Sequence, residues 1–186
     1  GTNIPFLVGG AFAFSHYTHV PRDTKDIDVF VKPDDCPRVL AAFEELGFSN
    51  VVTYINSGNV IFETAEADDL KLAEQIENAI EKEFSLNIKV MVRTIDEISE
   101  IIKNNPFDGQ FENNKDLHVL FLDEKMPEEK RELLIEHNSE NEKFIVRGRE
   151  IFCHLKNGFA GSLLGKDYIG KKLKVSATAR NWRTVN

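Results

Sequence analysis

Asp26 and Asp28 are two carboxylates whose spacing suits metal chemistry. They lie in the run 26–31, whose β-branched and aromatic residues are typical of a strand. Side chains two positions apart on a strand point to the same face, so these carboxylates can share a metal site. Magnesium prefers such oxygen ligands, completed by water and phosphate oxygens. The pattern predicts Asp26 and Asp28 as Mg2+ ligands and candidate catalytic residues.

Gly9 and Gly10 lie where a short strand is expected to turn into a helix. Glycines at such a turn let backbone amides approach a phosphate at the helix start. Arg22 and Lys25 carry positive charge that can neutralise phosphate. These four residues are the candidate cofactor-binding residues.

Ser57, Gly58 and Asn59 separate two expected strands. Gly allows a positive φ and Asn tolerates one, which is typical of a hairpin turn. The same backbone amides can also cradle an anion. The segment is therefore a turn by its simplest interpretation and an anion-binding candidate by the other.

Arg180, Trp182 and Arg183 form a basic and aromatic cluster near the carboxy terminus. Such a cluster can stack bases and pair phosphates. It can equally anchor the terminus, with Trp182 buried and the arginines paired to acidic residues. The aromatic-rich strand of RNA-binding plaits is absent, so nucleic acid is not the expected partner.

The charge is unevenly distributed along the chain. The net charge of the 186 residues is −8, but residues 143–186 carry a net +8 and residues 1–142 a net −16. A basic end on an acidic body either faces a polyanion or pairs with the body itself. Self-pairing is the interpretation we favour.

Composition excludes several classes of protein. Hydrophobic residues make up 41% of the chain, enough for a core, and no apolar run is long enough to cross a bilayer. The start Gly-Thr-Asn has no basic region before its apolar residues, so no secretion signal is expected. Two cysteines, Cys36 and Cys153, exclude a disulfide scaffold and favour the cytoplasm. No membrane partner is expected, and the oligomeric state is not predicted.

Hydrophobic periodicity predicts the same order of elements, β-α-β-β-α-β, in two successive passes. The first has strands at 26–31, 51–55, 59–63 and 88–92 and helices at about 34–46 and 68–84. The second has strands at 118–122, 144–146, 151–155 and 175–179 and helices at 128–136 and 162–173. Thr94 to Glu97 is a capping box that starts a linking helix.

This order predicts an α+β chain of two ferredoxin-like plaits. The expected organisation is an amino-terminal β-α extension at 1–25, a first plait at 26–93, a linking helix and loop at 94–116, and a second plait at 117–186.

From residue 46 onward, the chain resembles the bacterial family called domain of unknown function sixteen ninety-seven. Five segments carry the resemblance, in family order: 53–60, 92–94, 105–107, 146–150 and 177–185. The resemblance implies two ferredoxin-like subdomains. It implies no reaction, because the family has no established activity.

Residues 5–46 instead resemble the opening of a small nucleotidyltransferase. Leu7-Val8-Gly9-Gly10, Arg22, Thr24 and the run 26–31 carry this second resemblance. It implies that Gly9 and Gly10 hold nucleotide phosphates and that the Asp-x-Asp pair binds Mg2+. The superfamily also needs a third carboxylate from a later strand, and only Glu63, at a strand end, is acidic there.

The two resemblances together suggest an engineered or recombined chimera without established activity, and we do not expect an enzyme. The alternative is residual Mg2+-dependent nucleotide binding or nucleotidyl transfer at Asp26 and Asp28. A second alternative is anion or nucleic-acid binding by the basic carboxy-terminal region.

Overall fold

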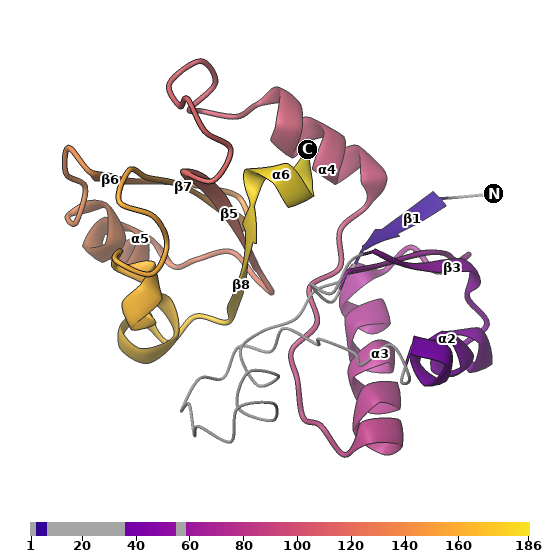
Figure 1. Cartoon of the computed structure of the whole chain (residues 1–186). Coiled ribbons are helices and arrows are strands. Elements are labelled where there is room, and N and C mark those ends of the chain that lie inside the picture. The colour runs from indigo at the N-terminus through magenta and orange to yellow at the C-terminus, as the bar shows by residue number, and fades with distance from the viewer. Residues whose placement is uncertain (1–2, 7–35, 55–58) are drawn as a thin grey trace. The chain divides into compact units, whose positions relative to one another are not determined.

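The computed structural model describes residues 3–6, 36–54 and 59–186 (Figure 1). The chain is α+β, with two antiparallel sheets and several helices. It divides into two compact units, residues 1–98 and 99–186. Within the described ranges, no helix is both long and apolar enough to cross a membrane.

The first unit is a three-stranded antiparallel sheet with helices on one side (Figure 1). Its elements are β1 (Asn3–Phe6), α2 (Cys36–Glu45), β3 (Ser49–Tyr54), β4 (Asn59–Glu63) and α3 (Asp69–Phe84). The strand order is β1-β4-β3. Helix α4 (Ile95–Lys103) follows, and the boundary between the two units falls within it.

Three phenylalanines join α2 to the first sheet. Phe43 of α2 packs edge-on against Phe48 and Phe62, with ring centroids 5.7 Å apart in each pair. Phe48 and Phe62 stack at 4.3 Å, and all three side chains are buried. Aromatic pairs at these separations gain stability beyond that of the buried area, so this cluster holds the helix layer on the strands.

The ends of α3 follow from its flanking residues. The Asp68 carboxylate accepts hydrogen bonds from the amides of Leu70 and Lys71, both at 3.1 Å. Ser85 ends the helix in the left-handed region, at φ 56°, and its amide donates to the Glu81 carbonyl at 2.8 Å. The predicted helix at 68–84 is confirmed, because its capping carboxylate and its apolar face are both used.

The edge of the first sheet differs from the expectation. Strand β1 pairs antiparallel with β4, with Ile4 opposite Phe62. The sequence predicted 26–31, not residues 3–6, as the first strand of this sheet. Residues 26–31 lie outside the described part of the chain.

The predicted strand at 88–92 is wrong. Ile88, Val90 and Val92 are buried, but so is Met91 between them, and the segment is not assigned as a strand. Burial alone does not make a strand, which also needs a ladder of hydrogen bonds to a neighbouring strand.

The linking helix α4 begins as its capping box predicts. The Thr94 amide donates to the Glu97 carboxylate at 2.7 Å, and the Glu97 amide donates to the Thr94 hydroxyl at 3.0 Å. These reciprocal bonds satisfy two amides that the first turn of the helix leaves open.

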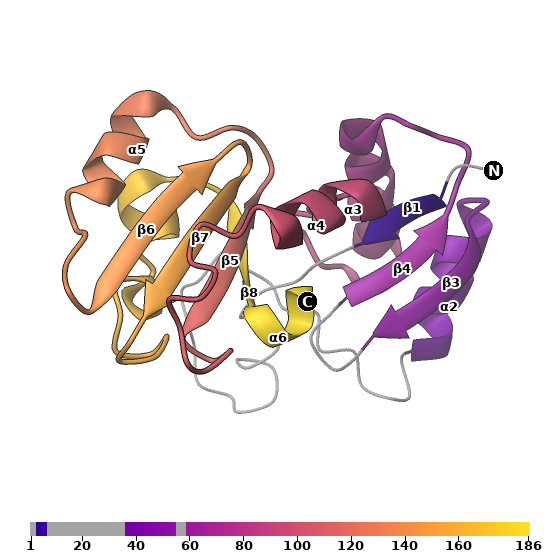
Figure 2. The same cartoon turned by 90° about the horizontal axis from the view of Figure 1, so that it is seen from above.

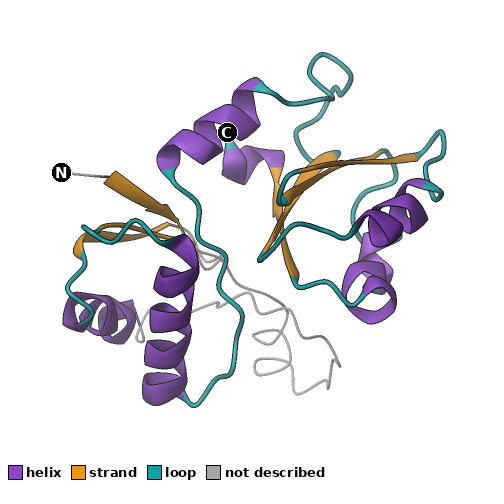
Figure 3. Cartoon of the chain, turned by 180° about the vertical axis from the view of Figure 1, so that it is seen from behind, coloured by secondary structure: helices purple, strands orange, loops and turns teal. Residues whose placement is uncertain are grey.

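The second unit is a four-stranded antiparallel sheet with the order β6-β7-β5-β8 (Figure 2). Its elements are β5 (Leu117–Leu122), α5 (Glu128–Ile135), β6 (Glu142–Arg147), β7 (Glu150–Leu155), β8 (Ala177–Asn181) and α6 (Trp182–Val185). One face packs on α5 and on the segment before β8 (Figure 3). Its buried core includes Leu120, Phe144, Ile151 and Leu155.

The predicted helix at 162–173 is wrong, although its apolar residues are in the core. The segment forms a short 3-10 helix η2 (Leu164–Lys166) and a π-helical turn η3 (Ile169–Leu173). Asp167 adopts a left-handed conformation between them, at φ 54°, which ends the first turn. A Cβ on Gly165 would lie 2.6 Å from the carbonyl oxygens of Phe159 and Ala160, so only glycine fits this close approach.

Replacing Asp68 by Ala should lower the free energy of unfolding by about 1 kcal/mol, because two amides at the start of α3 lose their acceptor. Urea denaturation measures this loss. Glu74→Ala, an exposed change within the same helix, is the control and should have a much smaller effect. Equal losses in both variants would contradict the capping role of Asp68.

Candidate functional site

The predicted nucleotide and Mg2+ site lies outside the described residues: Gly9, Gly10, Arg22, Lys25, Asp26 and Asp28. The Mg2+ and nucleotide interpretation of these residues stays a prediction. Ser57 and Gly58, two of the anion-binding candidates, also lie outside the described residues. Among the residues that the structure does describe, no three His, Cys, Asp or Glu side chains gather closely enough to hold a metal ion. Asn59 is the first residue of β4, lies opposite Tyr54 and is 2% exposed.

The three residues of the predicted carboxy-terminal cluster have different surroundings. Arg180 is buried on β8, where its guanidinium donates to the Thr178 hydroxyl at 3.0 Å and to the Ala179 carbonyl at 2.7 Å. Trp182 begins α6, is 5% exposed and packs edge-on against Phe111. Arg183 is exposed. A buried Trp182 matches the anchoring interpretation better than base stacking, which needs an accessible ring.

A basic cluster lies instead at one end of the second sheet. Lys143 on β6 is directly opposite His154 on β7. Lys156 comes two residues after His154, just beyond the end of β7. Both lysines are exposed, whereas His154 is 7% exposed. We call these three residues the basic end.

The pKa of His154 lies below its ordinary value, first because burial disfavours the charged ring. Asp116 opposes this shift, and Lys156 and Lys143 lower the pKa further by repulsion. In the part of the chain that the structure describes, no ion pair joins either lysine to an acid. The basic end therefore presents two ammonium groups beside an imidazole that is mainly neutral at pH 7.

The loop that follows α4, from Asn104 to Phe107, packs against the β6–β7 hairpin beside the basic end. The Asn104 carbonyl accepts a hydrogen bond from the Arg147 guanidinium at the end of β6. Further along, the Phe107 ring lies 5.6 Å from the His154 ring, measured between centroids. The loop is thus fixed at both ends of the β6–β7 hairpin, and it contributes to the burial of His154.

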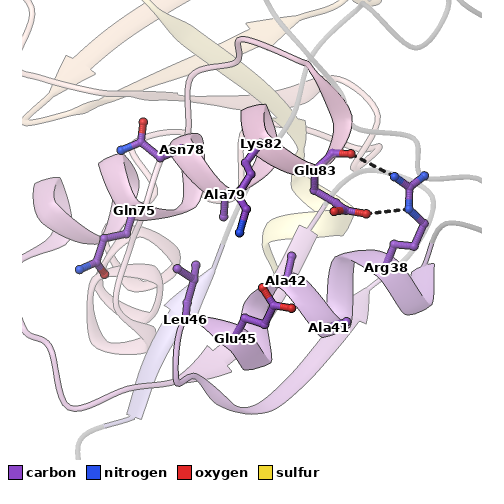
Figure 4. Close-up of a pocket in the computed structure, with 10 residues that line it drawn as sticks. All are labelled: Arg38, Ala41, Ala42, Glu45, Leu46, Gln75, Asn78, Ala79, Lys82 and Glu83. Carbon is purple, nitrogen blue, oxygen red and sulfur yellow. Dashed lines mark hydrogen bonds and ion pairs between the residues drawn. The ribbon is translucent and has the colours of Figure 1, made fainter.

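A groove of about 640 Å³ lies between α2 and α3 in the first unit (Figure 4). Ala41, Ala42, Leu46 and Ala79 form its apolar part. Figure 4 shows Arg38 closing one end through its bonds to Glu83, whose carboxylate accepts from the Arg38 Nε at 2.9 Å.

The charges of this groove do not select a ligand. Arg38 and Lys82 are balanced by Glu45 and Glu83. The Arg38 guanidinium also packs over the Phe84 ring, with its Cζ 4.6 Å from the ring centroid. The basic end is the stronger candidate because two exposed lysines lie close to His154 while one acid, Asp116, acts on the same ring.

Lys143, His154 and Lys156 lie within the basic region 143–186, which the sequence predicts as an alternative anion-binding region, but no sequence motif singles them out. The signal that finds them is the hairpin at 147–150. Once Arg147 is placed opposite Glu150, antiparallel counting puts Lys143 opposite His154.

Comparison with known proteins adds a family and a fold. A family model described as "Protein of unknown function (DUF1697)" matches residues 36–152. The solved structure of the conserved bacterial protein SP0830 from Streptococcus pneumoniae is similar over 100% of this chain and 95% of its own. That likeness has a TM-score of 0.69 at 16% sequence identity, so it shows the fold alone. No protein with a curated description matches the chain.

Replacing Lys156 by Gln should raise the pKa of His154 toward its ordinary value, because one repelling charge is removed. Replacing Asp116 by Asn should lower this pKa further, since the attraction to the imidazolium is lost. NMR titration of the ring protons measures both shifts. Lys166→Gln is the control and should leave the pKa unchanged, and the electrostatic description fails if all three variants titrate alike.

Proposed function

The chain belongs to the DUF1697 family of proteins of unknown function, and we propose that its second unit binds a phosphate-bearing anion at the basic end. The observation that carries the proposal is the pairing of Lys143 with His154 across two strands, with Lys156 just beyond. Neither lysine forms an ion pair with an acid within the described ranges. An anion would supply the missing counter-charge.

The chemistry of the basic end suits phosphate. Two ammonium groups donate charge-assisted hydrogen bonds to phosphate oxygens, which are stronger than neutral ones. A bound anion also favours the charged form of His154, so its imidazole would take up a proton and become a third donor. Asp116 attracts the charged form of the same ring and limits the net positive charge of the free site.

Binding, rather than catalysis, is the activity we propose. Cys153 is buried, and burial raises the pKa of its thiol well above the ordinary value, which leaves it a poor nucleophile. The groups at the basic end can hold a phosphate but provide no nucleophile next to a base.

We also propose that the second unit is a ferredoxin-like plait, with a related first unit. The sheet order β6-β7-β5-β8 supports this, since the first and third strands of the unit lie in the centre and the fourth lies beside the first. In the first unit, β1-β4-β3 has the same order for its first three strands.

A chimeric origin and a nucleotidyltransferase-like opening are proposals too. The start of the family match at residue 36, beyond Asp26 and Asp28, supports a different origin for the earlier segment. Calorimetry with Mg2+ and nucleoside triphosphates tests the nucleotide site, and binding heat that survives Asp26→Ala and Asp28→Ala excludes it.

We also propose a cytoplasmic location, which the low cysteine count supports.

Inorganic phosphate should bind the whole chain, and the double variant Lys143→Gln/Lys156→Gln should weaken binding by at least about tenfold, because two charge-assisted hydrogen bonds are lost. Isothermal titration calorimetry measures the affinity. Lys166→Gln/Lys172→Gln, with the same change in net charge, is the matched control and should bind as the unmodified chain does.

Binding should also be linked to proton uptake by His154, because the anion favours the charged ring. Sulfate, whose charge is constant in this pH range, should therefore bind more tightly as the pH falls through the range in which His154 titrates. Equal weakening in both double variants, or a sulfate affinity that does not change with pH, would overturn the proposal.

A further inference from the structure

A third lysine, Lys115, lies at the same end of the second sheet as the basic end. The Leu155 amide donates to the Asp116 carbonyl at 2.7 Å, so the β5–β7 ladder continues one residue beyond the start of β5. Antiparallel counting from this bond places Lys115 next to Lys156. Both lysine side chains are exposed, so a ligand in solution can reach them.

A turn holds the backbone of Lys115 at this position. The Asp116 amide donates to the Asn113 carbonyl at 2.9 Å, and the Lys115 amide donates to the Asn113 Oδ1, also at 2.9 Å. A side-chain oxygen that bonds to an amide two residues along the chain is typical of such turns. A ligand would therefore have to order only the Lys115 side chain.

Lys115 is farther from His154 than the two lysines of the basic end are. Lys143 and Lys156 both lower the pKa of His154 by repulsion, and Lys115 does not contribute to this shift. An anion beside the imidazole would thus be met first by Lys143 and Lys156. The ammonium group of Lys115 is then available for a second anionic group.

The three lysines belong to three neighbouring strands. Lys143 is on β6, Lys156 follows β7 and Lys115 precedes β5. Adjacent strands lie about 4.8 Å apart, so the row from β6 to β5 is about 10 Å wide. A ligand that engages all three ammonium groups must be longer than a single phosphate.

We infer that Lys115 binds the second phosphate of a diphosphate group whose first phosphate lies at the basic end. The inference rests on the proposed function, which provides the first phosphate site. A diphosphate suits this row because its linked phosphates each accept charge-assisted hydrogen bonds from ammonium groups. The substrate class is therefore a diphosphate, and Lys115 distinguishes it from a monophosphate.

Calorimetry with inorganic pyrophosphate and with orthophosphate, at one pH and one ionic strength, tests the inference. The whole chain should bind pyrophosphate more tightly than orthophosphate. Lys115→Gln should weaken pyrophosphate binding by at least about fivefold, as expected for one lost charge-assisted hydrogen bond at an exposed site. The affinity of this variant for orthophosphate should stay within about twofold of that of the unmodified chain.

Two control variants separate a contact from a general effect of charge. Lys115→Arg keeps the charge and should bind pyrophosphate as the unmodified chain does. Lys166→Gln removes one positive charge elsewhere in the second unit and should leave both affinities unchanged. Equal weakening of pyrophosphate binding by Lys115→Gln and Lys166→Gln would overturn the role of Lys115.

Adenosine diphosphate distinguishes two sources of the diphosphate group. If it binds and Lys115→Gln weakens it as it weakens pyrophosphate, the group is accepted with a nucleoside attached. If only pyrophosphate binds, the ligand is a free diphosphate.

The outcomes also separate this inference from the proposed function. If Lys143→Gln/Lys156→Gln weakens both inorganic anions while Lys115→Gln weakens neither, the phosphate site stands and the role of Lys115 is overturned. If the double variant weakens neither anion, the proposed function fails and the inference fails with it.

Discussion

The register of the β6–β7 hairpin is the constraint on which the rest of the second unit depends. Gly148 turns the chain at φ 61°, in the left-handed region that glycine adopts without strain. Arg147 and Glu150 then face each other, and every later pair follows to Glu142 opposite Leu155. A shift by one residue would move Phe144 and Cys153 out of the core and separate Lys143 from His154. The same turn that builds the core therefore assembles the basic end.

Electrostatics and burial act together at this end of the sheet. Burial keeps His154 mainly neutral, and the two lysines reinforce this by repulsion. Such a group changes its charge readily when an anion arrives, because the bound charge offsets both effects. Ion pairs elsewhere, such as Lys103 with Glu100, are exposed and contribute little to stability. Unneutralised charge beside a buried imidazole distinguishes the basic end from these surface pairs and from the balanced groove between α2 and α3.

Local signals in the sequence predicted much of the fold. Asp68 and the Thr94–Glu97 box mark helix starts because their side chains bond to nearby amides, an interaction only a few residues long. The segment before β8 could not be predicted in the same way. Leu164, Ile169 and Leu173 have helical spacing and are buried, but Asp167 and the close packing of Gly165 break the helix into two turns. Those breaks depend on contacts with the preceding loop, which periodicity does not report.

The sequence indicated the basic region 143–186 as a possible anion-binding region but not which residues meet within it. Lys143 and His154 become neighbours only through strand pairing. The most direct test of the account is a map of backbone amide NMR shifts over the whole chain on addition of inorganic phosphate. We expect the largest changes at Lys143, His154 and Lys156, with Arg38 and Lys82 in the groove unaffected. Shifts centred on Arg38 and Lys82, or none at the basic end, would contradict it.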